Sequence, residues 1–136
     1  MPTFVNITTF PPNTRIFVTS LANAAYQQTV TLTPPAGSQA RFSGSGEGNV
    51  AMPLETQGFL STGSGQPYFQ TASQSGTYKV QISSTAGAQN VQFSACTSAW
   101  TSGATANVLM VVGEDASDND FNDSVVLFTW YTPAVS

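Results

Sequence analysis

The sequence predicts an all-β fold: a single-domain antiparallel β-sandwich of about nine to ten strands with Greek-key connections, over residues 1–136. Apolar and polar side chains alternate with a period of two residues along many short segments, which is typical of half-buried antiparallel strands. No window repeats apolar residues at the i, i+3, i+4, i+7 spacing of an amphipathic helix. The 11 glycines and 8 prolines are scattered along the chain, as expected for many short strands joined by turns.

The alternation is clearest over residues 76–83, where Tyr78, Val80 and Ile82 share one face and polar residues share the other. Strands are expected to end at proline and glycine, because proline lacks an amide donor and glycine favours turns. These turn signals lie at residues 11–12, 34–35, 44–48, 63–65 and 86–87. In chain order, the expected strands cover residues 3–8, 15–21, 28–33, 39–43, 58–61, 68–72, 76–83, 89–95, 106–112 and 124–131.

Aromatic side chains at alternating strand positions are expected to pack in the core rather than to form platforms on which sugars stack. These residues are Phe17, Phe42, Phe93, Trp100 and Trp130. The single cysteine, Cys96, lies among small and apolar neighbours and cannot form an internal disulfide. We therefore expect a buried, unreactive thiol.

The composition excludes several classes of function. Three basic residues against seven acidic ones give a net charge of −4, too few cations to follow a phosphate backbone, so no nucleic-acid partner is expected. The absence of histidine removes the commonest general base, the catalytic triads and imidazole zinc sites. The most apolar stretches, residues 107–112 and 124–131, are far shorter than the ~20 residues that cross a bilayer. Without a signal-peptide pattern, we expect a soluble chain with no membrane insertion, either cytoplasmic or exported by another route.

The acidic residues are concentrated in one segment. Five of the seven lie between residues 114 and 123, and the nearest basic residue in the sequence, Lys79, is far away. Oxygen ligands without histidine or a nearby thiol favour a hard cation, and this many carboxylates favour Ca²⁺ over Mg²⁺. Asp118, Asp120 and Asn122 match the opening of an EF-hand loop, but Asp123 replaces its glycine, so this is a calcium loop of another kind. The alternative is a solvated acidic turn between two strands.

Three stretches then resemble a known family. Residues 113–123, which read Gly-Glu-Asp-Ala-Ser-Asp-Asn-Asp-Phe-Asn-Asp and lead to Trp130, resemble the calcium-dependent fucose- and mannose-binding lectins typified by the Pseudomonas lectin PA-IIL. Residues 13–23, which end in an Ala-Asn pair, and residues 41–44 resemble two earlier strands of that family. The resemblance covers about half of the chain. Residues 45–106 align poorly with the family.

The resemblance implies a site with two Ca²⁺ ions to which the sugar hydroxyls bind directly. The implied metal ligands are Asn23, Glu114, Asp118, Asp120, Asn122 and Asp123. The implied sugar-binding residues are Asn23, Ala24, Ala25, Tyr26, Asp115, Asp118, Asp120 and Asp123. The family's specificity loop follows Asn23, and the missing hydroxyl at Ala24 leans toward mannose over fucose. Six residues follow Trp130, three more than in the family, so the family's calcium contact through a terminal glycine is not expected in the same form.

The function that follows is a calcium-dependent carbohydrate-binding lectin without catalytic activity, specific for mannose- or fucose-containing glycans. A homo-oligomer, dimer or tetramer, is expected because single sugar sites are weak and several together gain avidity. One alternative is a structural or adhesion domain in which calcium stabilises the loop but no monosaccharide binds. Another is a glycoside hydrolase, whose paired carboxylates need no histidine.

Overall fold

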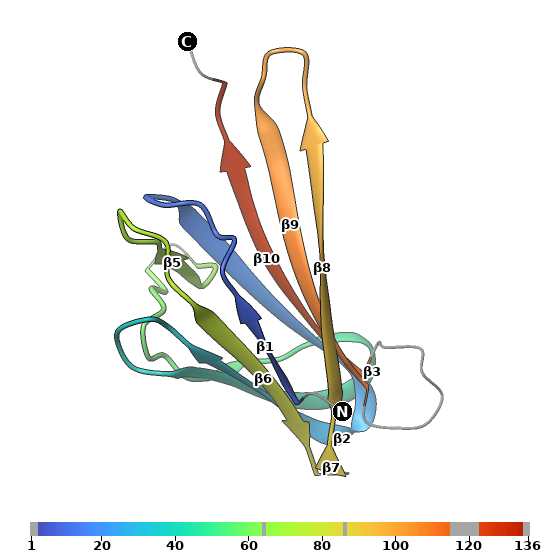
Figure 1. Ribbon diagram of the computed structural model, residues 1–136. Coiled ribbons are helices and arrows are strands. Elements are labelled where there is room, and N and C mark those ends of the chain that lie inside the picture. Colours follow the sequence, from blue (N-terminus) through green and yellow to red (C-terminus); the bar gives the residue numbers. More distant parts are fainter. Residues whose placement is uncertain (1–2, 64, 86, 115–122, 135–136) are drawn as a thin grey trace.

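The computed structural model describes residues 3–63, 65–85, 87–114 and 123–134 (Figure 1). Within these ranges the chain forms ten β-strands and no helix, which confirms the all-β antiparallel prediction. Accordingly, the described residues contain no helix able to span a membrane. The strands are β1 (Phe4–Ile7), β2 (Arg15–Thr33), β3 (Ala40–Ala51), β4 (Leu54–Thr56), β5 (Tyr68–Gln70), β6 (Tyr78–Ser84), β7 (Gly87–Ala88), β8 (Asn90–Ala99), β9 (Thr105–Glu114) and β10 (Ser124–Thr132).

The long strand β2 organises the fold. The main path through the sheet is β1-β6-β2-β10-β9-β8, and all pairs are antiparallel. The first part of β2 pairs with β10 up to Ala22, and the last part, from Gln28, pairs with β6. Residues 15–21 and 28–33, predicted as two strands, are therefore the two ends of one strand. Because β2 pairs with β10 at one end and with β6 at the other, it joins the β10-β9-β8 strands to the β6-β1 strands in one continuous, barrel-like sheet (Figure 1).

Two further differences from the prediction lie at glycines. The predicted turn at residues 44–48 lies inside β3, which continues to Ala51 with left-handed backbone at Gly46 and Gly48. The predicted strand at residues 58–61 is a turn that starts at Gly58, whose φ is +55°, and only Ser61 forms an isolated bridge. A side chain at Gly58 would run into the backbone of Gln39, so the close approach of two chain segments requires glycine in this turn.

Alternate residues of the strands build one hydrophobic core, with aromatic rings at its centre. The Phe10 ring lies 5.2 Å from that of Phe128 and 5.6 Å from that of Phe69, measured between centroids. Trp130 contacts Phe10 edge to face at 5.7 Å and packs against the core, as predicted. These tilted and edge-on arrangements add to the stabilisation that burial provides.

The β8–β9 hairpin extends past the neighbouring strands together with the end of β10 (Figure 1). Val91 is buried, but the rest of β8 from Gln92 to Ala99 is exposed. The prediction of a core position is therefore wrong for Phe93 (47% exposed) and for Trp100 (54% exposed), and Cys96 is exposed as well. Alternation predicts which residues share a face of a strand, but it does not predict whether another element covers that face.

Candidate functional site

Three segments that are far apart in sequence meet where β9 ends and β10 begins. Ser124, the first residue of β10, pairs with Gly113 of β9 on one side and with Ala22 of β2 on the other. The backbone N–H of Asn23 donates a 2.9 Å hydrogen bond to the carbonyl of Asp123. Glu114 follows Gly113 directly, so the sheet register gathers Asn23, Glu114 and Asp123 at one end of the sheet. These are three of the six predicted metal ligands.

The predicted specificity loop is the irregular middle of β2. The pairing of β2 with β3 shifts register between Ala22 and Ala24 and again between Ala24 and Gln28. The regular alternation of buried and exposed residues is interrupted here, and three consecutive residues after Ala24 are exposed. Ala24 itself is buried, and the Tyr26 side chain is 57% exposed. The bend therefore presents a short segment of small side chains followed by an exposed aromatic ring beside Asn23.

Asn49 of β3 holds the Asn23 side chain in place. The Asn49 backbone N–H donates to Oδ1 of Asn23 at 2.6 Å, and Nδ2 of Asn23 donates to Oδ1 of Asn49 at 2.9 Å. Because a backbone N–H can only donate, the atom of Asn23 that faces it must be the oxygen. An amide oxygen has two lone pairs, so this bond is compatible with metal ligation. Sequence reasoning missed Asn49, because it lies 26 positions from Asn23 and only the structure brings the two side chains together.

Both described acidic residues of the site are buried. Glu114 is 4% exposed and Asp123 is 7% exposed. Removing a carboxylate from water is unfavourable unless it is paired, hydrogen-bonded or bound to a cation. The burial of both carboxylates at one end of the sheet is compatible with a bound cation, whose charge they would balance.

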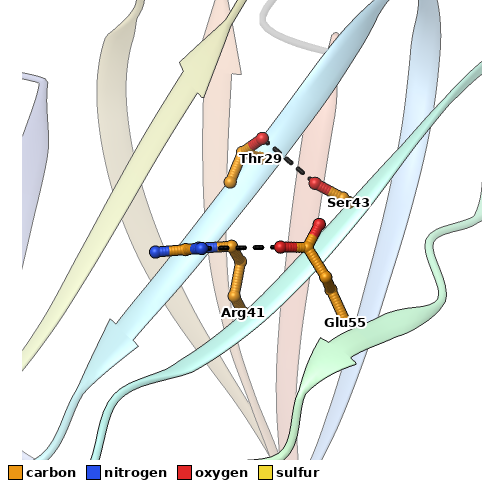
Figure 2. Close-up of polar contacts among 4 residues, drawn as sticks. All are labelled: Thr29, Arg41, Ser43 and Glu55. Carbon is orange, nitrogen blue, oxygen red and sulfur yellow. Dashed lines mark hydrogen bonds and ion pairs between the residues drawn. The ribbon is translucent and has the colours of Figure 1, made fainter.

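The three basic side chains of the protein contact residues outside the candidate site. Arg41 on β3 pairs with Glu55 on β4 at 3.4 Å, next to the 3.1 Å hydrogen bond between Thr29 and Ser43 (Figure 2). The Arg15 guanidinium lies 4.2 Å from the centre of the Tyr68 ring, and the Lys79 ammonium lies 4.4 Å from the centre of the Phe4 ring. Arg15 and Lys79 therefore contact aromatic faces, and the Arg41 pair links two strands on the surface.

Four predicted site residues, Asp115, Asp118, Asp120 and Asn122, lie outside the residues that the structure describes. Among those that it does describe, no three His, Cys, Asp or Glu side chains cluster as a metal site. The described donors nevertheless fit a hard cation, because Asn23, Glu114 and Asp123 offer only oxygen ligands. The two buried carboxylates provide the negative charge that such an ion requires.

Comparison with known proteins identifies the family. The family model described as fucose-binding lectin II (PA-IIL) matches residues 7–132. The Chromobacterium violaceum lectin CV2L, solved in complex with alpha-methyl-fucoside, is 26% identical, with a TM-score of 0.65 over 90% of this chain and 92% of that one. A Ralstonia solanacearum high-affinity mannose-binding lectin is 27% identical, with a TM-score of 0.64 over the same shares of the two chains.

The C-terminal domain of the Burkholderia cenocepacia lectin BC2L-C, at 19% identity and a TM-score of 0.58, shares the fold over 89% of this chain and 90% of that domain. No curated protein sequence matches the chain. The family match confirms the resemblance seen in the sequence, and lectins bind sugars without converting them. The chain therefore belongs to the fucose-binding lectin II (PA-IIL) family and is a carbohydrate-binding lectin, not an enzyme.

Proposed function

We propose that this lectin binds mannose- or fucose-type sugars through two Ca²⁺ ions held at the end of the sheet where β2, β9 and β10 meet. The observation that carries the proposal is the convergence of Asn23, Glu114 and Asp123 there, with both carboxylates buried. The relatives support the sugar class, since one was solved with a fucoside and another is described as mannose-binding. The proposed metal ligands are Asn23, Glu114, Asp118, Asp120, Asn122 and Asp123.

Bound Ca²⁺ would supply coordination positions that two neighbouring sugar hydroxyls can occupy. The residues of the chain bind and orient the sugar around those positions. Carboxylates accept short, charge-assisted hydrogen bonds from the same hydroxyls. In this proposal Asp115, Asp118, Asp120 and Asp123 accept such bonds.

The bend of β2 sets the shape of the proposed sugar site. Ala24 and Ala25 have small side chains that leave room for a pyranose ring beside Asn23. The exposed Tyr26 ring offers an apolar face against which the sugar can stack. Because Ala24 has no hydroxyl, we expect mannose to bind more tightly than fucose, and Ala24→Ser should move the preference toward fucose.

A glycan array probed in parallel calcium and EDTA buffers tests the proposal. Binding to mannosylated or fucosylated glycans that disappears in EDTA is the expected result. Asp123→Asn keeps the size of the side chain but removes its charge, so this variant should lose sugar binding. Glu55→Gln is the matched control, because Glu55 is an exposed acid whose partner is Arg41, and it should bind like the wild type.

Two results would contradict the proposal. Undiminished sugar binding in EDTA would exclude recognition through a metal. A calcium-dependent rise in melting temperature with no further rise on adding sugar would instead favour the structural role for calcium.

We also infer that two copies of the chain associate through the outer face of β9, β10 and β2. Antiparallel sheets usually present polar residues to solvent, yet paired positions on this face carry apolar side chains. Met110 lies opposite Leu127 in the next strand, and Val112 lies opposite Val125, which pairs with Leu21. Met110 is 38% exposed. No charged residue occurs in residues 105–113, 124–132 or 16–33, so nothing on these strands repels a second copy.

Sedimentation equilibrium tests the association. Met110→Lys places a charge at the centre of this face and should convert the oligomer into smaller species. Gln74→Lys adds the same charge in an exposed loop and should leave the mass unchanged. A wild-type monomer, or a Met110→Lys variant with the wild-type mass, would contradict the inference.

A further inference from the structure

A buried hydrogen-bond cluster lies at the same end of the sheet as the proposed calcium site. It consists of Gln28 of β2, Gln89 just before β8, and Ser124 at the start of β10. All three residues are fully buried. Ser124 donates a 2.7 Å bond from its hydroxyl to Oε1 of Gln28, and Gln89 donates from Nε2 to the same oxygen. Three separate segments are thus joined at one amide oxygen.

A single backbone carbonyl determines the orientation of the whole cluster. Nε2 of Gln28 donates a 3.0 Å bond to the carbonyl of Tyr26. Because a carbonyl can only accept, the amide nitrogen of Gln28 must face Tyr26 and its oxygen must face the other way. Gln89 and Ser124 must then both act as donors. Glutamine is the residue that fits, since glutamate at this position would place an acceptor against the Tyr26 carbonyl.

The cluster contacts both ends of the acidic segment. Ser124 directly follows Asp123, and Gly113 directly precedes Glu114. The Gln89 carboxamide lies against Gly113, where any side chain would run into it. Asn90, next to Gln89, pairs with Glu114 across the β8–β9 ladder. The cluster therefore ties the strands that carry Glu114 and Asp123 to the bend that carries Tyr26.

We propose that Gln28 is a positioning residue of the sugar site. Through its bonds with Gln89 and Ser124, it fixes the Ala24–Tyr26 bend relative to the two ends of the acidic segment, Glu114 and Asp123. This inference rests on the proposed calcium and sugar site. Gln28 touches neither ligand in this proposal. Its effect is to fix the Tyr26 carbonyl, and with it the segment between Asn23 and Gln28, by bonds that no solvent molecule can replace at a fully buried position.

Gln28→Met tests the inference, because methionine fills a similar volume without polar atoms. Thr71→Val is the matched control: Thr71 is also buried and hydrogen-bonded, donating to the Pro11 carbonyl at 2.6 Å, but it belongs to a different part of the fold. Both variants should lower the melting temperature. By calorimetric titration, Gln28→Met should weaken calcium and sugar binding at least about tenfold, whereas Thr71→Val should leave both affinities within about twofold.

A second measurement needs no ligand. In ¹H–¹⁵N spectra of the calcium-free protein, Gln28→Met should shift or broaden the backbone amides of Ala25, Tyr26 and Gln27, and Thr71→Val should not. These amides report on the bend itself, so unchanged signals in Gln28→Met would overturn the inference even if the wild type bound no sugar. If the wild type bound no sugar but the amide signals of Gln28→Met were perturbed, the result would contradict the proposed function and leave the positioning role of Gln28 intact.

Gln89→Leu keeps the inference testable if Gln28→Met does not fold. This variant removes one donor but leaves the Gln28 bond to the Tyr26 carbonyl in place. A smaller loss of calcium and sugar affinity, about threefold to tenfold, is expected. Wild-type affinities in a folded Gln28→Met or Gln89→Leu protein would refute the positioning role.

Discussion

Gly113→Ala should destabilise the protein more than any ordinary glycine-to-alanine change, because the added methyl group meets two buried side chains. Its Cβ would overlap the Gln89 carboxamide and lie 3.1 and 3.2 Å from two carbons of Ile82. Gln89 and Ile82 are both fully buried and have little room to move. Gly113 is the second-to-last residue of β9 and its φ is not left-handed, so alanine needs no unusual backbone conformation there.

The magnitude follows from these contacts. Overpacking a closed core costs about 1–3 kcal/mol. Displacing Gln89 weakens its bond to Gln28, which costs about 1 kcal/mol more. Alanine also restricts the unfolded chain more than glycine does, which stabilises the folded state by about 0.4–1 kcal/mol. The expected net loss is about 1–3 kcal/mol, and for a chain of this length it lowers the melting temperature by roughly 3–15 °C.

Urea unfolding followed by circular dichroism measures the loss, with Gly63→Ala as the control. A Cβ at Gly63 meets nothing within 4 Å and its φ is not left-handed, so this variant should be as stable as the wild type or slightly more stable. In the Gln89→Ala background, Gly113→Ala should cost at least about 1 kcal/mol less, since the overlapping carboxamide is gone. Equal stability of Gly113→Ala and Gly63→Ala would refute the reasoning.

Three further predictions concern the core, the alkaline limit and the surface. Phe128→Ala empties the centre of the aromatic cluster and should cost about 3–5 kcal/mol in urea unfolding, and a loss below about 2 kcal/mol would mean that the cluster refills the space. Burial raises the pKa of the Tyr78 phenol above 10.0, so its contribution to stability is complete below that pH and is lost as the pH rises through the folded-state value. Between about pH 9 and about pH 11, the free energy of unfolding should therefore fall less in Tyr78→Phe than in the wild type. An equal fall in both proteins would contradict the raised pKa of Tyr78. Arg41→Met breaks an ion pair whose side chains are both nearly half exposed, so stability at low and high salt should change by less than about 1 kcal/mol, and a larger loss would show that the pair is stronger than its exposure implies.

The sequence by itself was sufficient for the fold class and for the family. Alternation with a period of two depends only on which face of a strand a side chain occupies, so it predicted the all-β fold and the buried residues of β6, such as Val80 and Ile82. The acidic segment is contiguous, and its spacing identified the lectin family without any knowledge of long-range contacts. Asn23 was placed in the site by the resemblance to that family, and the sheet register brings it beside Asp123.

Only the tertiary structure decided which segments meet and which faces are covered. No local pattern predicts that residues 15–33 form one bent strand, because the bend depends on pairing with β3, β6 and β10 at the same time. The hydrogen bonds of Asn23 with Asn49, and of Gln28 with Gln89 and Ser124, join residues between 26 and 96 positions apart. Phe93 and Trp100 have the pattern of core residues but are exposed, because burial depends on whether another element covers them. Local sequence indicates which segments form strands and which side chains share a face, whereas packing between distant segments determines where strands join and end and which residues meet at the candidate site.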